Sequence, residues 1–257
     1  MTRSGLTLLF PLFTVLLITV VAAPVVCVLL SVTPAEVTRA FLSQPIRSAV
    51  SVSLAASLGA TAVATILGVP AGYALAQAPG RVRALAFFFL ALPLAFPPVA
   101  SGVMLLSVFG THAPIGGWFA AARMPVPDSL FGVATAEFFV SGSFVAITAA
   151  AAFSVLDPIY ADAARTLGAS EWKIFFRVAL PAAASTILAG IAFAWLRAIG
   201  EYGATSIVAY HPTSLPVALY VTLAASGVRQ ALALCYGFLI LVGLVIAMQW
   251  ILRRRIA

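Results

Sequence analysis

The sequence is poor in charged residues. Only 8% of its 257 residues are Asp, Glu, Lys or Arg, whereas 63% are hydrophobic and the mean hydropathy is +1.14. A soluble domain usually contains about 25% charged residues. Because a soluble core of this size cannot bury so much apolar surface, a water-soluble globular protein is excluded. We expect an all-α membrane protein with a single transmembrane domain over residues 1–257.

Cysteine is also scarce, which removes support for two kinds of site. Cys27 and Cys235 both lie inside apolar runs, without a CxxC or mixed Cys/His spacing. A disulfide framework or a metal site is therefore not expected, and buried thiols are the simpler interpretation. His112 and His211 lie in predicted connections with no third ligand nearby in the sequence, so we predict no metal site there either.

Lysine is nearly absent. The single lysine, Lys173, is followed by Ile174, so the phosphate-binding pattern GxxxxGK[ST] is missing and the chain cannot hold a nucleotide by that device. A membrane-embedded enzyme lacks a reactive constellation too, because no Ser/His/Asp or nucleophile-elbow pattern is present. If the chain moves a solute across a membrane, the energy must then come from ions or from a separate subunit. The net charge of +7 does not require a nucleic-acid partner, since Lys and Arg also set orientation in a membrane.

Long apolar runs are what the chain has in abundance. Six are long enough to span the bilayer, at about 6–31, 47–77, 84–109, 129–155, 183–209 and 228–252. The first exceeds the apolar core of about 7–15 residues of a signal peptide, so we interpret it as a retained helix. With the N-terminus inside, basic residues concentrate in the inner connections, which predicts that both termini are cytoplasmic. The inner connections hold Arg3, Arg81, Arg83, Arg165, Lys173, Arg177, Arg253, Arg254 and Arg255, and the outer ones hold Arg39, Arg47, Arg123 and Arg229.

The third apolar run is interrupted by proline. It reads LALPLAFPPVASGVMLL, with Pro93, Pro97 and Pro98 followed by Gly102. Proline removes a backbone donor and clashes with the preceding turn, and freed carbonyls at membrane depth must be buried in protein or line a wet cavity. Two interpretations stay open: a kink that helps packing, or a gate on a substrate path.

The fifth run carries charge inside the membrane. In FAWLRAIGEYGAT, Arg197 and Glu201 are four residues apart and share one helical face. A charge at this depth is costly unless it is paired or faces a polar cavity. The pair is therefore either self-neutralised and structural, or part of the lining of a path for a charged solute, where Gly203 would allow close approach of another helix. Glu137, in the fourth run, is a further intramembrane acid whose partner the sequence does not reveal.

Between the fourth and fifth runs lies an unusually polar stretch, residues 157–181, containing YADAARTLGASEWKIFFRVALP. Asp157 and Pro158 predict a helix start, and Gly168 suits its C-terminal end. Ser170 can cap a second helix, which Pro181 is expected to interrupt before the fifth run. The pattern predicts a short helix, a glycine bend and a second helix tied to a membrane span.

This stretch resembles the cytoplasmic loop of the membrane subunits of binding-protein-dependent ABC importers, whose pattern is EAA-xxx-G-xxxxxxxxx-I-x-LP. The residues that match outright are Ala163, Ala164, Gly168, Leu180 and Pro181, while Asp162 replaces the glutamate and Val178 the isoleucine. The resemblance implies a coupling helix that docks on an ATPase subunit. The two alanines make the helix thin enough for a groove, and Asp162 and Arg165 can fix its orientation by polar contacts.

The likeness extends from about Ala49 to Leu252. LPLAFPPVASGVMLLSVFG, DAARTLGAS and RAIGEYGATSIVA are most similar to the membrane subunits of molybdate importers, with sulfate and tungstate relatives close. Their GEFGAT corresponds to Gly200 through Thr205, with Tyr202 for the phenylalanine. The chain departs from them in the compact AYHPTSLPVALY and in VSGSF, where relatives have a longer loop and an apolar-Pro-Phe element. These departures leave the fold unchanged and the exact anion open.

The resemblance implies a type I ABC importer permease fold with about six transmembrane helices and a coupling helix between the fourth and fifth. The implied function is ATP-driven import of an oxyanion, molybdate first, by alternating access across the cytoplasmic membrane. The chain itself would be non-catalytic and bind no cofactor, with ATP-Mg on the partner. The implied partners are a cytoplasmic ABC ATPase dimer, an extracytoplasmic solute-binding protein, a second permease copy and the lipid bilayer, with no nucleic acid.

Alternatives remain for the oligomer, the substrate and the class of protein. The permease pairs either with a second copy of itself, as a homodimer, or with a sister permease, as a heterodimer. Sulfate, tungstate, a phosphonate or ferric ion are alternative substrates. An ion-driven carrier or channel, with Arg197, Glu201 and Glu137 as coupling groups, is the alternative of another class. The residues assigned to a path or gate are Pro97, Pro98, Gly102, Arg197, Glu201 and Gly203.

Overall fold

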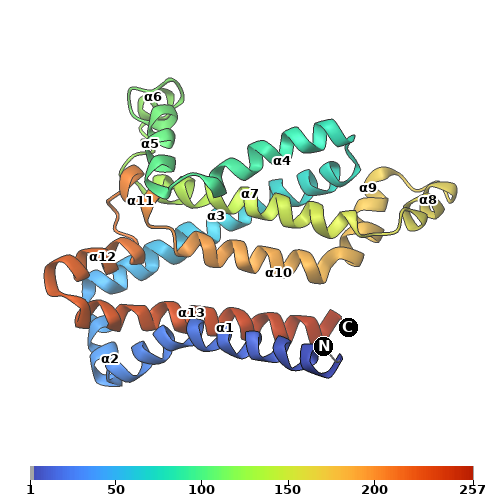
Figure 1. The fold of residues 1–257 in the computed structure, drawn as a ribbon. Coiled ribbons are helices and arrows are strands. Elements are labelled where there is room, and N and C mark those ends of the chain that lie inside the picture. The colour runs from blue at the N-terminus through green and yellow to red at the C-terminus, as the bar shows by residue number, and fades with distance from the viewer. Residues whose placement is uncertain (1–2, 257) are drawn as a thin grey trace.

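The computed structural model of the chain describes residues 3–256, and their side chains over residues 9–251. All the regular elements in this range are helices, which confirms the all-α prediction (Figure 1). The side chains of Arg3 and Arg253–Arg255, used above to predict orientation, lie outside the described ones. The helices are α1 (Arg3–Ser31), α2 (Pro34–Leu42), α3 (Gln44–Gln77), α4 (Gly80–Ala95), α5 (Pro98–Phe109), α6 (Pro114–Ala121), α7 (Leu130–Ser154), α8 (Pro158–Thr166), α9 (Glu171–Ile174), the π-helical turn η1 (Phe175–Ala179), α10 (Leu180–Ile199), α11 (Gly203–Val208), α12 (Leu215–Ser226) and α13 (Val228–Ile256).

Five stretches of helix are long and apolar enough to cross a membrane: Leu9–Ser31, Gln44–Gln77, Leu130–Ser154, Glu171–Ile199 and Val228–Ile251. The pair α4 and α5 forms a sixth candidate, but the two helices are bent by 113°. The expected run 84–109 is therefore not one straight helix. Phe96 and Pro97 between them have extended backbones, because a residue before proline is kept out of the helical region.

The fifth span also differs from the expected 183–209. Helix begins at Glu171 and continues through η1 and α10 to Ile199, and a separate short helix, α11, follows after a break. The chain is not interrupted at Pro181. The π-helical turn, in which the N–H of Leu180 pairs with the carbonyl of Phe175, comes first. Pro181 follows this turn as the second residue of α10, and the helix continues through it.

The core is built from small residues that let helices approach closely. Gly68 and Gly72 of α3 lie against α7, and a Cβ at Gly72 would meet the Cβ of Ala149 at 2.6 Å and the backbone N of Ala150 at 2.7 Å. Small residues favour this kind of contact in membrane bundles. Helix α10 packs against both α3 and α7, so these three helices form the centre of the molecule.

The arrangement places the polar loop and both chain ends together. Helices α1 and α13 lie side by side along one edge, tied by the hydroxyl of Tyr236, which donates to the carbonyl of Leu29 at 2.7 Å. Both termini lie at the end of the bundle from which α8 and α9 project, while α2, α5, α6 and α12 lie toward the opposite end (Figure 1). Cys27 is exposed on α1, so the prediction of a buried thiol was wrong for this residue. It lies within the apolar span Leu9–Ser31, whose most apolar stretch is not buried against the rest of the protein.

Candidate functional site

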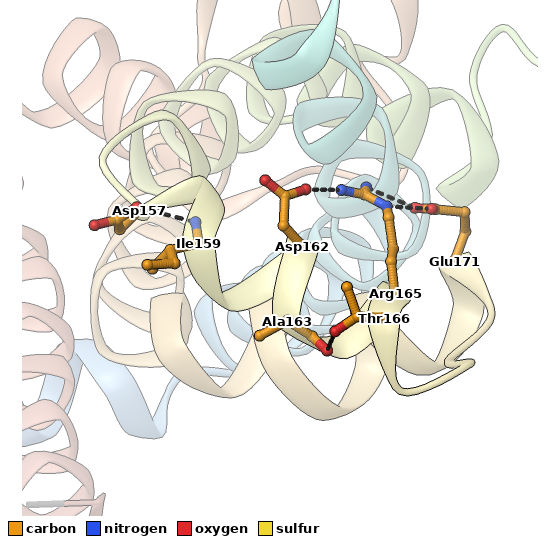
Figure 2. A network of polar contacts seen from close by, with 7 residues as sticks. All are labelled: Asp157, Ile159, Asp162, Ala163, Arg165, Thr166 and Glu171. Atoms are coloured by element: carbon orange, nitrogen blue, oxygen red, sulfur yellow. Dashed lines mark hydrogen bonds and ion pairs between the residues drawn. The ribbon is translucent and has the colours of Figure 1, made fainter.

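Helix α8 begins as its sequence predicts. The carboxylate of Asp157 accepts a hydrogen bond from the N–H of Ile159 at 2.9 Å, and Pro158 occupies the first turn (Figure 2). None of the residues of α8 is buried. Ile159 and Tyr160 of α8 and Leu167, which directly follows the helix, are 62%, 64% and 88% exposed. A short helix that exposes its large apolar side chains at one end of the protein is a surface suited to a protein partner.

Arg165 holds the polar loop in shape. Its Nη1 donates to Asp162 at 2.8 Å, and its Nε and Nη2 donate to the two carboxylate oxygens of Glu171 at 2.9 and 3.3 Å (Figure 2). These hydrogen bonds, to Glu171 first and then to Asp162, raise the pKa of Arg165. The guanidinium therefore joins α8 to α9. The sequence predicted polar contacts of Asp162 and Arg165, and the structure shows that they are made within the loop itself.

Gly168 makes the bend between α8 and α9. Its φ of +77° lies in the left-handed region. Its N–H bonds to the carbonyl of Arg165 at 2.9 Å, and the N–H of Ala169 bonds to the carbonyl of Ala164 at 3.0 Å. These are the two bonds of a Schellman ending, for which glycine is preferred. Ser170 precedes α9 without forming the side-chain cap expected of it.

The remaining motif residues connect the loop to the core. Ala163 is exposed and Ala164 is half-buried, so the first helix does present a thin side. Leu180 packs against the core cluster that includes Phe153, Phe175 and Ala179. Because η1 and α10 continue from α9 without a gap, the helix that Arg165 of α8 contacts through Glu171 runs on into the centre of the bundle.

The break after α10 is held together by Glu201. This side chain is 1% exposed. Its Oε1 accepts a hydrogen bond from the N–H of Ala204 at 3.0 Å, and its Oε2 lies 2.6 Å from Nη1 of Arg197 in an ion pair without a well-aligned hydrogen bond. The Arg197 side chain is 40% exposed. Glu201 is thus fixed by the helix ends it joins, whereas the guanidinium of Arg197 keeps an open side.

Two glycines bring the third and fifth segments together. A Cβ at Gly102 would lie 2.7 Å from the Cβ of Ile207 and 3.0 Å from the carbonyl oxygen of Ala204, and a Cβ at Gly203 would overlap Pro98. Helices α5 and α11 therefore touch backbone to backbone. Three of the residues assigned to a gate meet at this junction, and Pro97 lies at the α4–α5 bend beside it.

Glu137 of α7 lies near this junction and is fully buried. Neither of its carboxyl oxygens has a hydrogen-bond partner among the described residues. It is close enough to Glu201 for the two groups to interact electrostatically. Ser141, one turn further along α7, is also buried with an unpartnered hydroxyl. The structure thus gives Glu137 a neighbouring acid, Glu201, where the sequence had revealed no partner.

The sequence interpretation missed a groove between α3, α10 and α13. It has a volume of about 560 Å³, and Trp195, Thr61 and Thr65 are among its lining residues. The indole N–H of Trp195 donates to the hydroxyl of Ser57 at 2.9 Å across the helices. The tryptophan two residues before Arg197 was the available signal. The groove is mostly apolar. Its few polar groups are the hydroxyls of Thr61 and Thr65 on α3 and other side chains such as the indole of Trp195 on α10, which line the same open space.

Comparison with known proteins gives a consistent set of relatives. A family model described as "Binding-protein-dependent transport system inner membrane component" matches residues 68–256. The chain is 36% identical over 223 residues to a probable molybdenum ABC transporter permease protein of Haloferax volcanii, covering 87% of this chain and 80% of that one. It is 30% identical over 260 residues to a molybdate/tungstate transport system permease protein of Thermococcus kodakarensis, covering 99% of both. A sulfate transport system permease protein of Synechocystis is 34% identical over 198 residues, covering 73% and 72%.

Solved structures agree on the fold. A chain of a bacterial ABC transporter that imports alginate superposes with a TM-score of 0.73 at 14% identity, covering 98% of this chain and 96% of that one. A chain of the methionine ABC transporter in inward-facing conformations gives 0.67 at 15% identity, covering 84% and 100%. The predicted type I ABC importer permease fold is confirmed.

Proposed function

The chain belongs to the family of binding-protein-dependent transport system inner membrane components, and we propose that it is the permease subunit of an ATP-driven importer of a tetrahedral oxyanion, molybdate first. The observation that carries the substrate is the near full-length similarity to a molybdate/tungstate permease. The similarity to a sulfate permease keeps sulfate as the alternative.

Helix α8 is the proposed docking surface for a cytoplasmic ATPase dimer. It projects from the bundle with exposed apolar side chains. The ion pairs of Arg165 with Asp162 and Glu171, together with the turn at Gly168, hold its orientation relative to α9. The continuity of α9, η1 and α10 supports a coupling role, because ATP-driven motion of α8, which Arg165 joins to Glu171 of α9, would move the helix that carries Arg197. In this proposal the chain hydrolyses nothing and binds no cofactor, and ATP-Mg is held by the partner.

The remaining partners and the orientation follow from the same proposal. The end of the bundle that carries α8 faces the cytoplasm together with both termini, and an extracytoplasmic binding protein delivers the anion at the opposite end. Two copies of the chain form a homodimer around the path. The exposed guanidinium of Arg197 lines that path and compensates the charge of the anion, while Glu201 and the junction of Pro98, Gly102 and Gly203 form the gate.

The docking proposal is tested by Leu167, the exposed apolar residue that directly follows α8. Leu167→Ser should weaken capture of the ATPase by the purified permease, because Leu167 is 88% exposed and its replacement removes apolar contact area without disturbing the core. Met124→Ser is the matched control, since Met124 is 61% exposed in the connection after α6 at the opposite end. Equal ATPase capture by the two variants would contradict the assignment of α8.

The substrate is tested through the cognate binding protein. Isothermal titration with molybdate, tungstate, sulfate and a phosphonate should show tight binding of molybdate and tungstate. Selective binding of sulfate would replace molybdate by the alternative substrate. Tight binding of the phosphonate alone would refute an inorganic oxyanion altogether.

A further inference from the structure

A polar groove lies at the end of the bundle away from the termini. It has a volume of about 450 Å³ and is formed by α2, the start of α3, the end of α12 and the start of α13. Its polar lining includes Glu36, Arg39, Ser43, Ser226, Arg229 and Gln230. With two guanidinium groups and one carboxylate, its charged side chains carry one net positive charge.

The groove is built around one fixed arginine and one free arginine. Glu36 accepts hydrogen bonds from the N–H and hydroxyl of Thr33, each at 2.8 Å, and its other oxygen lies 3.0 Å from Nη2 of Arg229. The N-cap of α2 thereby positions Arg229. Arg39, in the last turn of α2, is exposed and has no acidic partner among the side chains that the structure describes. An anion that enters the groove would give Arg39 the partner it lacks.

The level of the groove in the membrane narrows the class of ligand. The apolar spans Leu9–Ser31 and Gln44–Gln77 end and begin on either side of α2, and the last span begins at Val228. The groove therefore lies where hydrocarbon gives way to polar headgroups. Its lining changes in the same sense: Arg229 and Gln230 are followed one turn deeper, about 6 Å along the helix, by Ala233 and Leu234. The charged residues Arg39 and Arg229 at the groove entrance, with the apolar Ala233 and Leu234 deeper in it, match the chemistry of a phosphate group with attached acyl chains.

We propose that this groove binds the phosphodiester headgroup of an anionic phospholipid, with Arg39 and Arg229 on the phosphate oxygens and the acyl chains against Ala233 and Leu234. Guanidinium groups bind phosphate by paired, charge-assisted hydrogen bonds. The bound lipid would fasten α2 to α13 at the outer end, where Phe41 of α2 already lies against Gly237 of α13. The site is independent of the transported substrate.

The test measures binding of fluorescent phosphatidylglycerol to the purified full-length chain in detergent. Arg39→Gln should weaken binding about tenfold, which is typical of the loss of one charge-assisted contact. Arg47→Gln is the matched control, because Arg47 lies in the first turn of α3 at the same end without lining the groove. Its affinity should equal that of the wild type. Size-exclusion profiles should be the same for all variants.

Two further ligands separate the headgroup from the chains. Diacylglycerol, which has the chains without the phosphate, and glycerol 3-phosphate, which has the phosphate without the chains, should each compete poorly. Equal competition by glycerol 3-phosphate would make this a site for a soluble anion and overturn the proposal. Equal competition by diacylglycerol, or equal affinity of the two glutamine variants, would overturn it as well. So would an Arg39→Gln variant that binds lipid normally but fails to dock the binding protein.

Discussion

Replacement of Gly168 tests the proposed coupling role of α8 most specifically. At φ +77° an L-residue pays about 1–2 kcal/mol, and no atom lies within 4 Å of an added Cβ, so Gly168→Ala changes backbone conformation alone. That cost lowers the ratio of the hydrogen-bonded turn at residue 168 to conformations in which this turn is broken by roughly five- to thirty-fold. Proline cannot adopt this φ and also removes the 2.9 Å hydrogen bond to the carbonyl of Arg165. Gly168→Pro must therefore open the turn that lets Arg165 reach Glu171.

The assay is binding-protein-stimulated ATP hydrolysis and uptake by the assembled transporter in proteoliposomes. We expect a partial loss of stimulation for Gly168→Ala and an almost complete loss for Gly168→Pro. Gly227→Ala is the control, because Gly227 also has a positive φ, +86°, with no atom within 4 Å of an added Cβ, but lies between α12 and α13 at the other end. It should leave association with the ATPase unchanged. If Gly168→Pro assembled and transported like the wild type, α8 would not be the coupling element.

Three other changes probe separate parts of the account. Arg197→Ala should reduce uptake without preventing assembly, at a stability cost of roughly 1–3 kcal/mol because buried Glu201 loses its ion pair; wild-type uptake would make the pair purely structural. Trp195→Phe should lower the free energy of unfolding by about 1 kcal/mol, through loss of the 2.9 Å hydrogen bond between α10 and α3, and an unchanged denaturation midpoint would contradict this. The backbone N–H and then the hydroxyl of Thr33 hold the pKa of Glu36 below 4.5, so its stabilising effect is present at neutral pH and is lost as the pH falls through that lowered pKa. The difference in thermal stability between wild type and Glu36→Gln should therefore shrink in acid, and a difference independent of pH would refute this.

Local sequence patterns predicted the elements whose cause is local. Apolar runs located the spans, and the Asp157–Pro158 start and Gly168 end bounded α8 as the structure has it. The adjacent prolines indicated a break in the third run, but the 113° angle between α4 and α5 depends on their packing partners. The proline rule alone failed at Pro181, because a π-helical turn just before it lets the helix continue.

Contacts between distant segments could not be derived from one sequence. Gly102 meets α11 from about a hundred residues away, and only the folded chain shows that this glycine and Gly203 lie at one junction. The neighbour of Glu137 was also beyond reach, because an acid beside an acid follows no pairing rule. The pairing of Arg197 with Glu201 was accessible from their spacing of four residues, although Glu201 lies just beyond the end of α10 and not on the same helix.

The most direct test of the central claim is molybdate uptake by proteoliposomes that contain the purified chain, with and without its ATPase and binding protein. The account predicts uptake only when all three proteins and internal ATP-Mg are present, with no effect of imposed ion gradients. Uptake by the chain alone, driven by an ion gradient, would contradict it and identify an ion-coupled carrier or channel instead.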